Sequence, residues 1–171
     1  MRPSLRPSLF ALATLIGALG SAGPAQAVSQ TAKVSAKVVK PLTIKWVQDL
    51  DLGTITLGSG TWSNATVAIT RGGMFSCTSS NVTCSGATNV ATYNIVGSNN
   101  QSVRVSAPNV TLVNQADPAR TLTLVVDGPG TVTIPNSGNR GVDVSLGGSI
   151  TLTSATASGV YSGTFNVTVD Y

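Results

Sequence analysis

Apolar and polar residues alternate one by one in many short runs along this chain. The last run is the cleanest, because Phe165, Val167, Val169 and Tyr171 occupy every second position and polar residues fill the positions between them. Successive side chains of a β-strand point to opposite faces, so such a run places one face on a core and the other in water. Roughly ten such runs, punctuated by Gly, Asn and Pro, predict an all-β, single-domain antiparallel β-sandwich.

The composition agrees with a β-rich fold and leaves few groups for catalysis. His and Glu are absent, and charged residues make up 9% of the chain. A helical bundle normally depends on Glu, Lys and Leu, so that class is excluded. Without His, the usual general base and the commonest metal ligand are both missing. We therefore expect no enzyme activity, no metal and no cofactor.

Residues 1–27 have the pattern of a secretory signal. A positively charged start precedes a twelve-residue apolar run, and the small-x-small sequence Ala25-Gln26-Ala27 follows. The apolar run is too short to span a bilayer, which takes about 20 residues. Cleavage after Ala27 would leave residues 28–171 as one exported domain. We expect no integral membrane segment in this mature chain, which should be exported to the periplasm, the cell surface or the extracellular space.

Four lysines lie near the start of the mature chain. They are too sparse, and too poor in interleaved aromatic residues, for a nucleic-acid footprint. Charges of this kind commonly solubilise an exposed strand. We therefore expect no nucleic-acid partner. The four are Lys33, Lys37, Lys40 and Lys45.

The two cysteines predict a disulfide. Cys77 and Cys84 flank a polar loop, and an even cysteine count in an exported chain favours pairing. Two thiols without His or further Cys do not make a zinc site. Because the loop is short, the bridge should stabilise the fold by only about 2.5 kcal/mol. We interpret it as a clamp on a loop or hairpin.

Two glycine-containing segments mark changes of direction or strand boundaries. The sequence Gly97-Ser98-Asn99-Asn100 lies between two alternating runs, which predicts a β-hairpin. Gly147-Gly148 separates a run at 142–146 from another at 150–152.

Asp49 and Asp51 are the closest acidic pair. At i and i+2 on a strand they would point the same way, which could suit a Ca²⁺ ion or paired catalytic carboxylates. The alternative is the polar face of one strand beside the turn at Gly53. We favour this alternative.

Three segments, taken in order, resemble a known family. The run from Gly159 to Tyr171 (GVYSGTFNVTVDY) is the most specific, and it follows the segment Leu146–Leu152 (LGGSITL). Earlier segments are Ala91–Gly97 and the N-terminal pair Val39–Ile44 and Asp49–Ile55. This order resembles the exported bacterial domain of unknown function 4402 family, which is similar to the major subunits of Mat/Ecp-type fimbriae.

The resemblance implies an immunoglobulin-like sandwich that assembles by donor-strand exchange. A sandwich that lacks a strand exposes an apolar groove and an unpaired edge, which an extended segment of another chain can complete. Identical subunits joined head to tail in this way form an open filament. The implied partners are a periplasmic chaperone, an outer-membrane usher and further copies of the chain.

Two segments have the alternation that such an assembly needs. Residues 28–39 contain the candidate donor positions, and the C-terminal run is the candidate chaperone-pairing strand. Residues 31–39 could equally be the first strand of the domain itself. The donor positions are Ala32, Val34, Ala36 and Val38, and the chaperone-pairing positions are Phe165, Val167, Val169 and Tyr171.

Two functions from different classes follow. We expect an exported structural or adhesive surface protein, namely a fimbrial, pilin-like subunit assembled through β-strand complementation. The alternative is a self-contained extracellular binding module for a carbohydrate or a matrix component. Such a module would need a concave aromatic site, for which Trp46, Trp62 and Tyr161 are the candidates.

Overall fold

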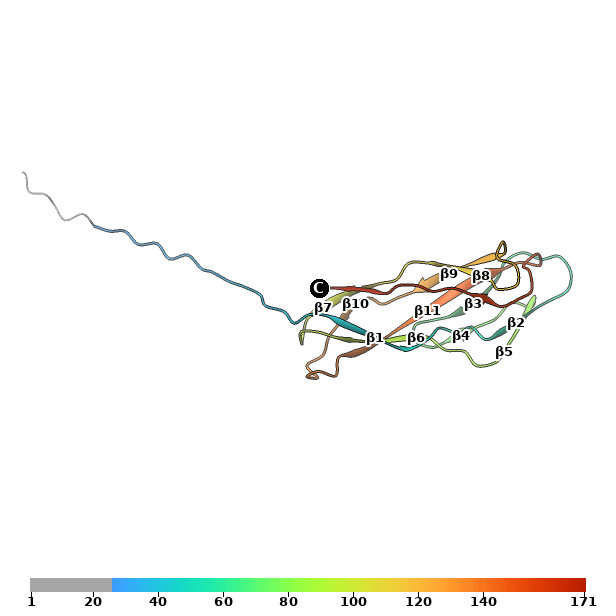
Figure 1. The fold of residues 1–171 in the computed structure, drawn as a ribbon, viewed down its shortest axis with the longest axis horizontal. Helices are drawn as coiled ribbons and strands as arrows, with labels where there is room; N and C mark the ends of the chain where they lie inside the picture. The colour runs from blue at the N-terminus through green and yellow to red at the C-terminus, as the bar shows by residue number, and fades with distance from the viewer. Residues whose placement is uncertain (1–25) are drawn as a thin grey trace, which may run out of the picture. The chain divides into compact units, whose positions relative to one another are not determined.

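The computed structural model describes residues 26–171. The expected secretory signal therefore lies almost entirely outside the described residues. The chain divides into a first unit that ends at Ala36 and a second unit from Lys37 to Tyr171. Residues 26–36 contain no strand, whereas the second unit is all-β (Figure 1). Within the described residues no helix is long and apolar enough to span a bilayer.

Thirteen strands follow one another in the described part of the chain. Most are short, and β11 is the longest. Their bounds are β1 Thr43–Gln48, β2 Thr54–Leu57, β3 Ala65–Ile69, β4 Phe75–Ser76, β5 Val82–Ser85, β6 Ala91–Val96, β7 Ser102–Ser106, β8 Val110–Asn114, β9 Thr121–Asp127, β10 Gly130–Thr133, β11 Val142–Leu152, β12 Tyr161–Ser162 and β13 Thr168–Asp170.

Every ladder between these strands is antiparallel. The largest sheet has the order β1-β6-β11-β9-β8-β12, with β3 paired to β11 and β4 paired to β3. A second sheet has the order β10-β7-β13, and β2 and β5 form a third. The predicted single all-β domain with antiparallel pairing is thus confirmed.

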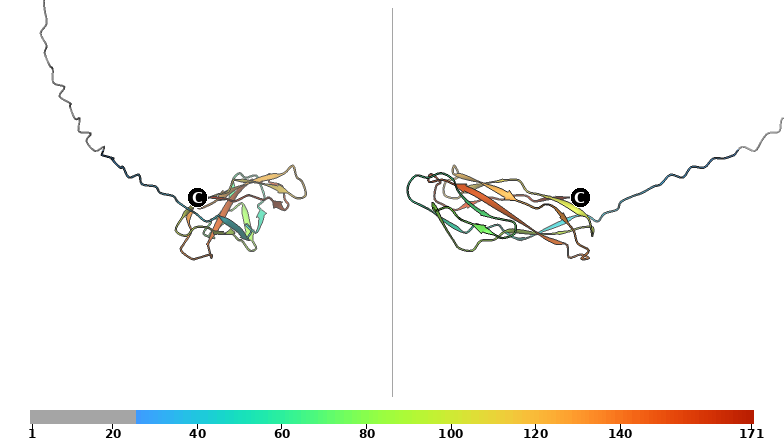
Figure 2. Two further views of the ribbon diagram at one scale, coloured as in Figure 1. Left: turned by 60° about the vertical axis from the view of Figure 1, so that its left-hand side comes forward. Right: turned by 180° about the vertical axis from the view of Figure 1, so that it is seen from behind.

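Strand β11 belongs to both halves of the large sheet. Its first half pairs with β6 and its second half pairs with β9 and β3, and Figure 2 shows its long course through the folded unit. Gly147 lies where the partners change, and a side chain there would meet the carbonyl oxygen of Ile69 and the backbone of Thr70. Gly147-Gly148 is therefore a close approach inside one strand, and not a boundary between two.

The core consists of two clusters of buried apolar residues. Leu50, Val126 and Phe165 pack against both clusters and so connect them. The first cluster contains Leu52, Ala65, Val67, Ile69, Val82, Val110, Leu124, Ile150 and Leu152. The second contains Ala91, Ile95, Val103, Val105, Ile134, Val144 and Leu146.

The predicted hairpin around Gly97–Asn100 is wrong. Strand β6 pairs with β1 and β11, whereas β7 pairs with β10 and β13. The turn thus carries the chain from one sheet to another. Turn residues such as Asn100, with φ of 58°, favour a reversal whether or not the flanking strands then pair.

The alternating segment before β1 forms no ladder in the single chain. The first strand is β1, and not residues 31–39. The side chains of Val28, Val34 and Val38 are 83%, 90% and 91% exposed.

Candidate functional site

Four of the strands that stand at the ends of the sheets, each with one unpaired edge, come from two stretches of the chain. β1 and β2 are consecutive and form the N-terminal arm (residues 43–57), and β12 and β13 form the C-terminal arm (residues 156–171). β1 pairs only with β6, and β2 pairs only with β5. In the same way, β12 pairs only with β8, and β13 pairs only with β7. No other strand in residues 26–171 pairs with them. Free edges of this kind present unpaired backbone N–H and C=O groups to any extended chain.

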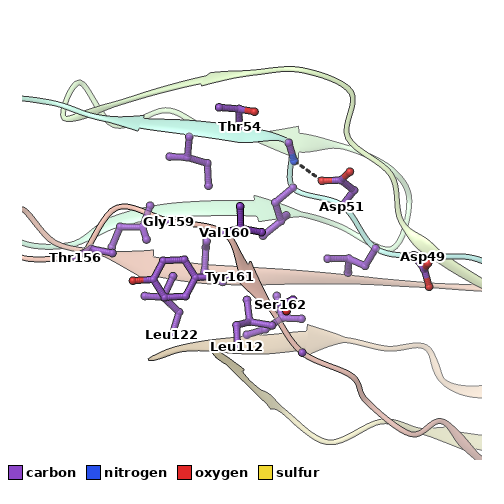
Figure 3. A pocket seen from close by; sticks show the side chains of 18 of the residues that line it. Asp49, Asp51, Thr54, Leu112, Leu122, Thr156, Gly159, Val160, Tyr161 and Ser162 are labelled. Carbon is purple, nitrogen blue, oxygen red and sulfur yellow. Dashed lines mark hydrogen bonds between the residues drawn. The ribbon is translucent and has the colours of Figure 1, made fainter. Parts of the chain in front are cut away.

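A groove of about 1050 Å³ separates the two arms. Residues 49–57 form its N-terminal bank and residues 156–165 its C-terminal bank. Figure 3 shows Leu112, Leu122 and Tyr161 on the side opposite the segment that carries Asp51 and Thr54. The floor is apolar and comes from β8, β9 and β11, through Leu112, Leu122, Leu124, Ile150 and Leu152.

Core-facing side chains of both arms are incompletely covered. Tyr161 and Phe165 in the C-terminal arm are only half-buried. In the N-terminal arm, Trp46 lies opposite Tyr93, which packs against the second core cluster. Residues opposite each other in an antiparallel pair share a face, and yet the Trp46 side chain is 64% exposed. The uncovered apolar surface therefore continues from the groove along β1.

Backbone and carboxylate hydrogen bonds shape the N-terminal bank. The Asp51 carboxylate accepts a hydrogen bond from the Gly53 N–H at 2.8 Å, and the Asp51 backbone exchanges two hydrogen bonds with Asn89. Gly53 has φ of +73°, and a Cβ there would lie 2.7 Å from the Ser85 carbonyl oxygen. Glycine is therefore required at this turn.

Asp49 and Asp51 do not converge on one site. The Asp49 carboxylate accepts a hydrogen bond from the Trp46 indole N–H at 2.9 Å, whereas Asp51 holds the turn at Gly53. Across the described residues, no group of three or more His, Cys, Asp or Glu side chains could hold a metal ion. Both carboxylates instead make the N-terminal bank of the groove acidic.

Burial and a nearby charge both change the pKa of Tyr93, which also lines the groove. Burial raises the pKa of Tyr93, and the negative charge of Asp49 raises the pKa further. Both effects disfavour the phenolate.

A buried amide holds the C-terminal bank. The side chain of Asn114, which is 1% exposed, donates to the Ser158 carbonyl at 3.0 Å and accepts from the N–H of Ala116 at 2.9 Å. Gly159 packs on this amide with φ of +146°, and a Cβ there would lie 2.6 Å from Asn114 Oδ1. Asn114 carries no local signal in the sequence, although Gly159 in the C-terminal run is a visible signal of a tight contact.

Tyr171 links the C-terminal arm to the residues just before β1 and to the turn after β6. The Tyr171 hydroxyl accepts a hydrogen bond from the Ser98 N–H at 2.8 Å and donates one to the Lys40 carbonyl at 2.6 Å. The Lys40 N–H donates to Ser98 Oγ at 2.6 Å. We call this set of three residues the Tyr171 latch. Gly97 makes room for it, because a Cβ there would lie 2.7 Å from the Tyr171 hydroxyl oxygen.

In the rest of the predicted chaperone-pairing strand, the apolar side chains pack on the core and the backbone forms one short ladder. Phe165, Val167 and Val169 pack against the second core cluster, and the polar residues between them are exposed. Only Thr168–Asp170 forms a ladder, which it makes with β7. The predicted alternation of faces is therefore confirmed, and the opposite edge of this strand is unpaired.

The disulfide between Cys77 and Cys84 is confirmed, but it does not close a hairpin. Cys77 directly follows β4, which pairs with β3, and Cys84 lies on β5, which pairs with β2. Cys84 is the register partner of Ile55 on the N-terminal bank. The bridge thus connects the two-stranded sheet that carries this bank to the large sheet.

The three aromatic candidates for a concave ligand site are in different environments. Tyr161 lines the groove, and its hydroxyl donates to the Ala157 carbonyl. Trp62 packs against the first core cluster, and its indole N–H donates to the Gly58 carbonyl. Trp46 lies exposed on the edge strand β1.

Comparison with known proteins gave one match. A family model described as domain of unknown function (DUF4402) matches residues 42–171. No curated protein and no solved structure matches the chain. The matched region begins one residue before β1 and includes both arms, so it contains the whole groove.

Proposed function

We propose, from the premise that the chain belongs to the family described as domain of unknown function 4402, that it is an exported structural or adhesive subunit of a surface filament. In this proposal an extended strand of another subunit fills the groove between the two arms. The observation that carries the proposal is that β2 and β12, each with an unpaired edge, line the two banks of one groove with an apolar floor.

A strand inserted there would both pair with free backbone groups and cover apolar side chains. Its backbone N–H and C=O groups could pair with the free edges of β2 and of the C-terminal arm. Its alternate apolar side chains would cover the half-buried Ile55, Tyr161 and Phe165. Removing apolar surface from water stabilises the fold by about 25 cal/mol per Å². The acceptor should therefore be more stable when filled than when empty.

Export and assembly helpers belong to the same proposal. The pattern of residues 1–27 and the Cys77–Cys84 bridge suit an oxidising compartment outside the cytosol. There, a periplasmic chaperone would cover the groove by pairing with the free edge of the C-terminal arm. An outer-membrane usher would then exchange the chaperone strand for that of the next subunit.

The proposal can be tested by supplying the missing strand in the same molecule. Residues 28–171 would be compared with a variant in which a second copy of residues 28–39 follows Tyr171 through a short flexible linker. We expect the first protein to form oligomers that grow with concentration in size-exclusion chromatography. The extended variant should be a monomer with a higher unfolding midpoint. In a matched control, Val34→Asp and Val38→Asp in the added copy should remove this gain.

The proposal would be overturned if residues 28–171 were monomeric at every concentration, unfolded reversibly, and had the same unfolding midpoint with and without the added strand. That outcome would favour the alternative of a self-contained binding module.

A further inference from the structure

We propose that a second, smaller pocket binds a sugar that carries a carboxylate, with Arg120 on the carboxylate and threonine hydroxyls on the hydroxyls of the sugar. Binding there does not depend on strand insertion or on filament assembly, so the inference goes beyond the proposed function. Its basis is the way the pocket forms in the sheet, the fixed position of its walls, and the chemistry of the residues that line it.

The pocket lies where two neighbouring strands of the large sheet part, and its volume is about 380 Å³. β9 and β11 pair from Asp127 and Gly147 as far as Leu124 and Ile150. Beyond this point β9 continues to pair with β8, and β11 with β3. We call the resulting space the strand-end pocket. Its lining residues come from 119–122 on one side, and from 151–157 and Tyr161 on the other.

One buried amide holds both walls of the strand-end pocket. The Asn114 side chain accepts a hydrogen bond from the Asp117 N–H at 3.3 Å, just before the first wall. It also donates to the Ser158 carbonyl at 3.0 Å, just after the second wall. The Tyr161 hydroxyl adds a hydrogen bond of 2.9 Å to the Ala157 carbonyl. A site whose walls are fixed before binding loses little conformational entropy when its ligand enters.

Arg120 is positioned by a turn and by an ion pair. Its N–H donates to the Asp117 carbonyl at 2.9 Å, and its Nε lies 3.5 Å from Asp117 Oδ2. The other oxygen of this carboxylate accepts the Ala119 N–H at 3.1 Å. Asp117 thus holds one side of the guanidinium, whereas the two terminal nitrogens have no partner within residues 26–171. Two such nitrogens match the two oxygens of a carboxylate.

The charge of the strand-end pocket favours an anion. Among the described residues that line it, Arg120 carries the only charge. The Asp49 and Asp51 carboxylates line the groove and not this pocket. A ligand with one negative charge therefore complements the strand-end pocket better than it complements the groove.

The remaining lining residues suit the ring of a sugar. Hydroxyl groups both donate and accept hydrogen bonds, as the hydroxyls of a sugar do. Leu122 and Tyr161 line both this pocket and the groove and add an apolar surface (Figure 3). Ligand pockets have volumes of about 300–1,000 Å³, so the strand-end pocket has room for a single sugar unit. The hydroxyls belong to Thr121, Thr151, Thr153 and Thr156.

A matched pair of sugars tests the inference on residues 28–171. Methyl glucuronide differs from methyl glucoside only in its carboxylate, and N-acetylneuraminic acid is a second acidic sugar. Saturation-transfer difference NMR reads the signals of the sugar and tolerates oligomers of the protein. We expect at least one acidic sugar to bind at least tenfold more tightly than the glucoside.

Three variants locate the binding. Arg120→Gln should weaken binding of the acidic sugar at least tenfold, because it removes the charge and the paired nitrogens. Thr121→Val removes a hydroxyl at nearly constant volume, and it should weaken binding severalfold. Arg140→Gln is the matched control, since Arg140 is exposed and does not line the pocket. This control should bind as tightly as the unchanged chain.

Three results would contradict the inference. Equal binding of the glucoside and the acidic sugars would exclude a carboxylate on Arg120. Equal competition by acetate would show an anion site that does not recognise the sugar. If neither acidic sugar bound, or if Arg120→Gln bound as before, the strand-end pocket would not be the site. The proposed function is tested separately by chromatography, so either proposal can fail without the other.

Discussion

Asn114 is the single side chain on which the C-terminal bank most depends. Replacing it with Ala would remove its hydrogen bonds to the Ser158 carbonyl and the Ala116 N–H, which it makes from a position that is 1% exposed. A hydrogen bond contributes about 0.5–1.5 kcal/mol net, so we expect the loss of these two to lower the free energy of unfolding of Asn114→Ala by about 1–3 kcal/mol. Urea titration would measure it. Asn109→Ala is the matched control, because the exposed Asn109 accepts only the Val126 N–H. An equal loss in both variants would contradict the role of Asn114.

Tyr93 should report the charge of the neighbouring Asp49. Because the pKa of Tyr93 is raised in the folded state, its proton is lost first from the unfolded chain as the pH rises above about 10. The contribution of Tyr93 to stability is therefore present below that pH and is lost above it. In an ultraviolet titration, one tyrosine should ionise at a higher pH than an unperturbed tyrosine does. Asp49→Asn should lower the pKa of Tyr93 only in part, since burial is the larger cause. An unchanged titration would contradict the coupling.

The sequence predicts which way side chains point better than it predicts what they touch. Alternation placed Phe165, Val167 and Val169 on a core face because period 2 is a local property of the chain. The partner of Asn114 at Ser158 and the partner of Tyr171 at Lys40 are 44 and 131 residues away along the chain. No local pattern reports such distances, so the anchor of the C-terminal bank and the latch emerge only from the fold.

Local sequence patterns also fail to predict how the strands are connected. A glycine pair inside β11 and a glycine turn after β6 look alike in the sequence, although one continues a strand and the other crosses to another sheet. The difference lies in what approaches the glycine. At Gly147 the backbone of β3 leaves no space for a side chain, whereas at Gly97 the space is taken by Leu42 and Tyr171. The groove itself could be expected only through the family resemblance, because it depends on how both arms pair.

The disulfide should stabilise one element of the groove more than the rest. Cys84 lies on β5, which is the pairing partner of β2. Replacing both cysteines with Ser should cost about 2.5 kcal/mol, as for a loop of this length. Hydrogen exchange should accelerate most in β2 and β5, and least in the sheet of β10, β7 and β13. Uniform acceleration in all sheets would contradict a local clamp.

The folded unit is an all-β domain with a groove between its two arms. Both arms keep their apolar residues half-covered, and both keep one edge unpaired. Anything that binds only the folded state stabilises it in proportion to its concentration. In the proposed function a strand of a neighbour fills the groove, so the stability of the chain and its assembly should respond to the same substitutions.

Trp46 offers an optical measurement of that contact. The strand of residues 28–39 that the proposed function supplies is longer than the nine residues of the N-terminal bank, so one end of it should reach the level of Trp46 and cover an indole that is now 64% exposed. In a Trp62→Phe variant, where Trp46 is the remaining tryptophan, emission should shift to shorter wavelength as the protein concentration rises. Trp46→Phe, which keeps Trp62 packed on the first core cluster, should show no shift. Deleting residues 28–38 should abolish the shift in the first variant. If the shift persisted after this deletion, a different surface would cover Trp46, and residues 28–38 would not be the strand that covers it.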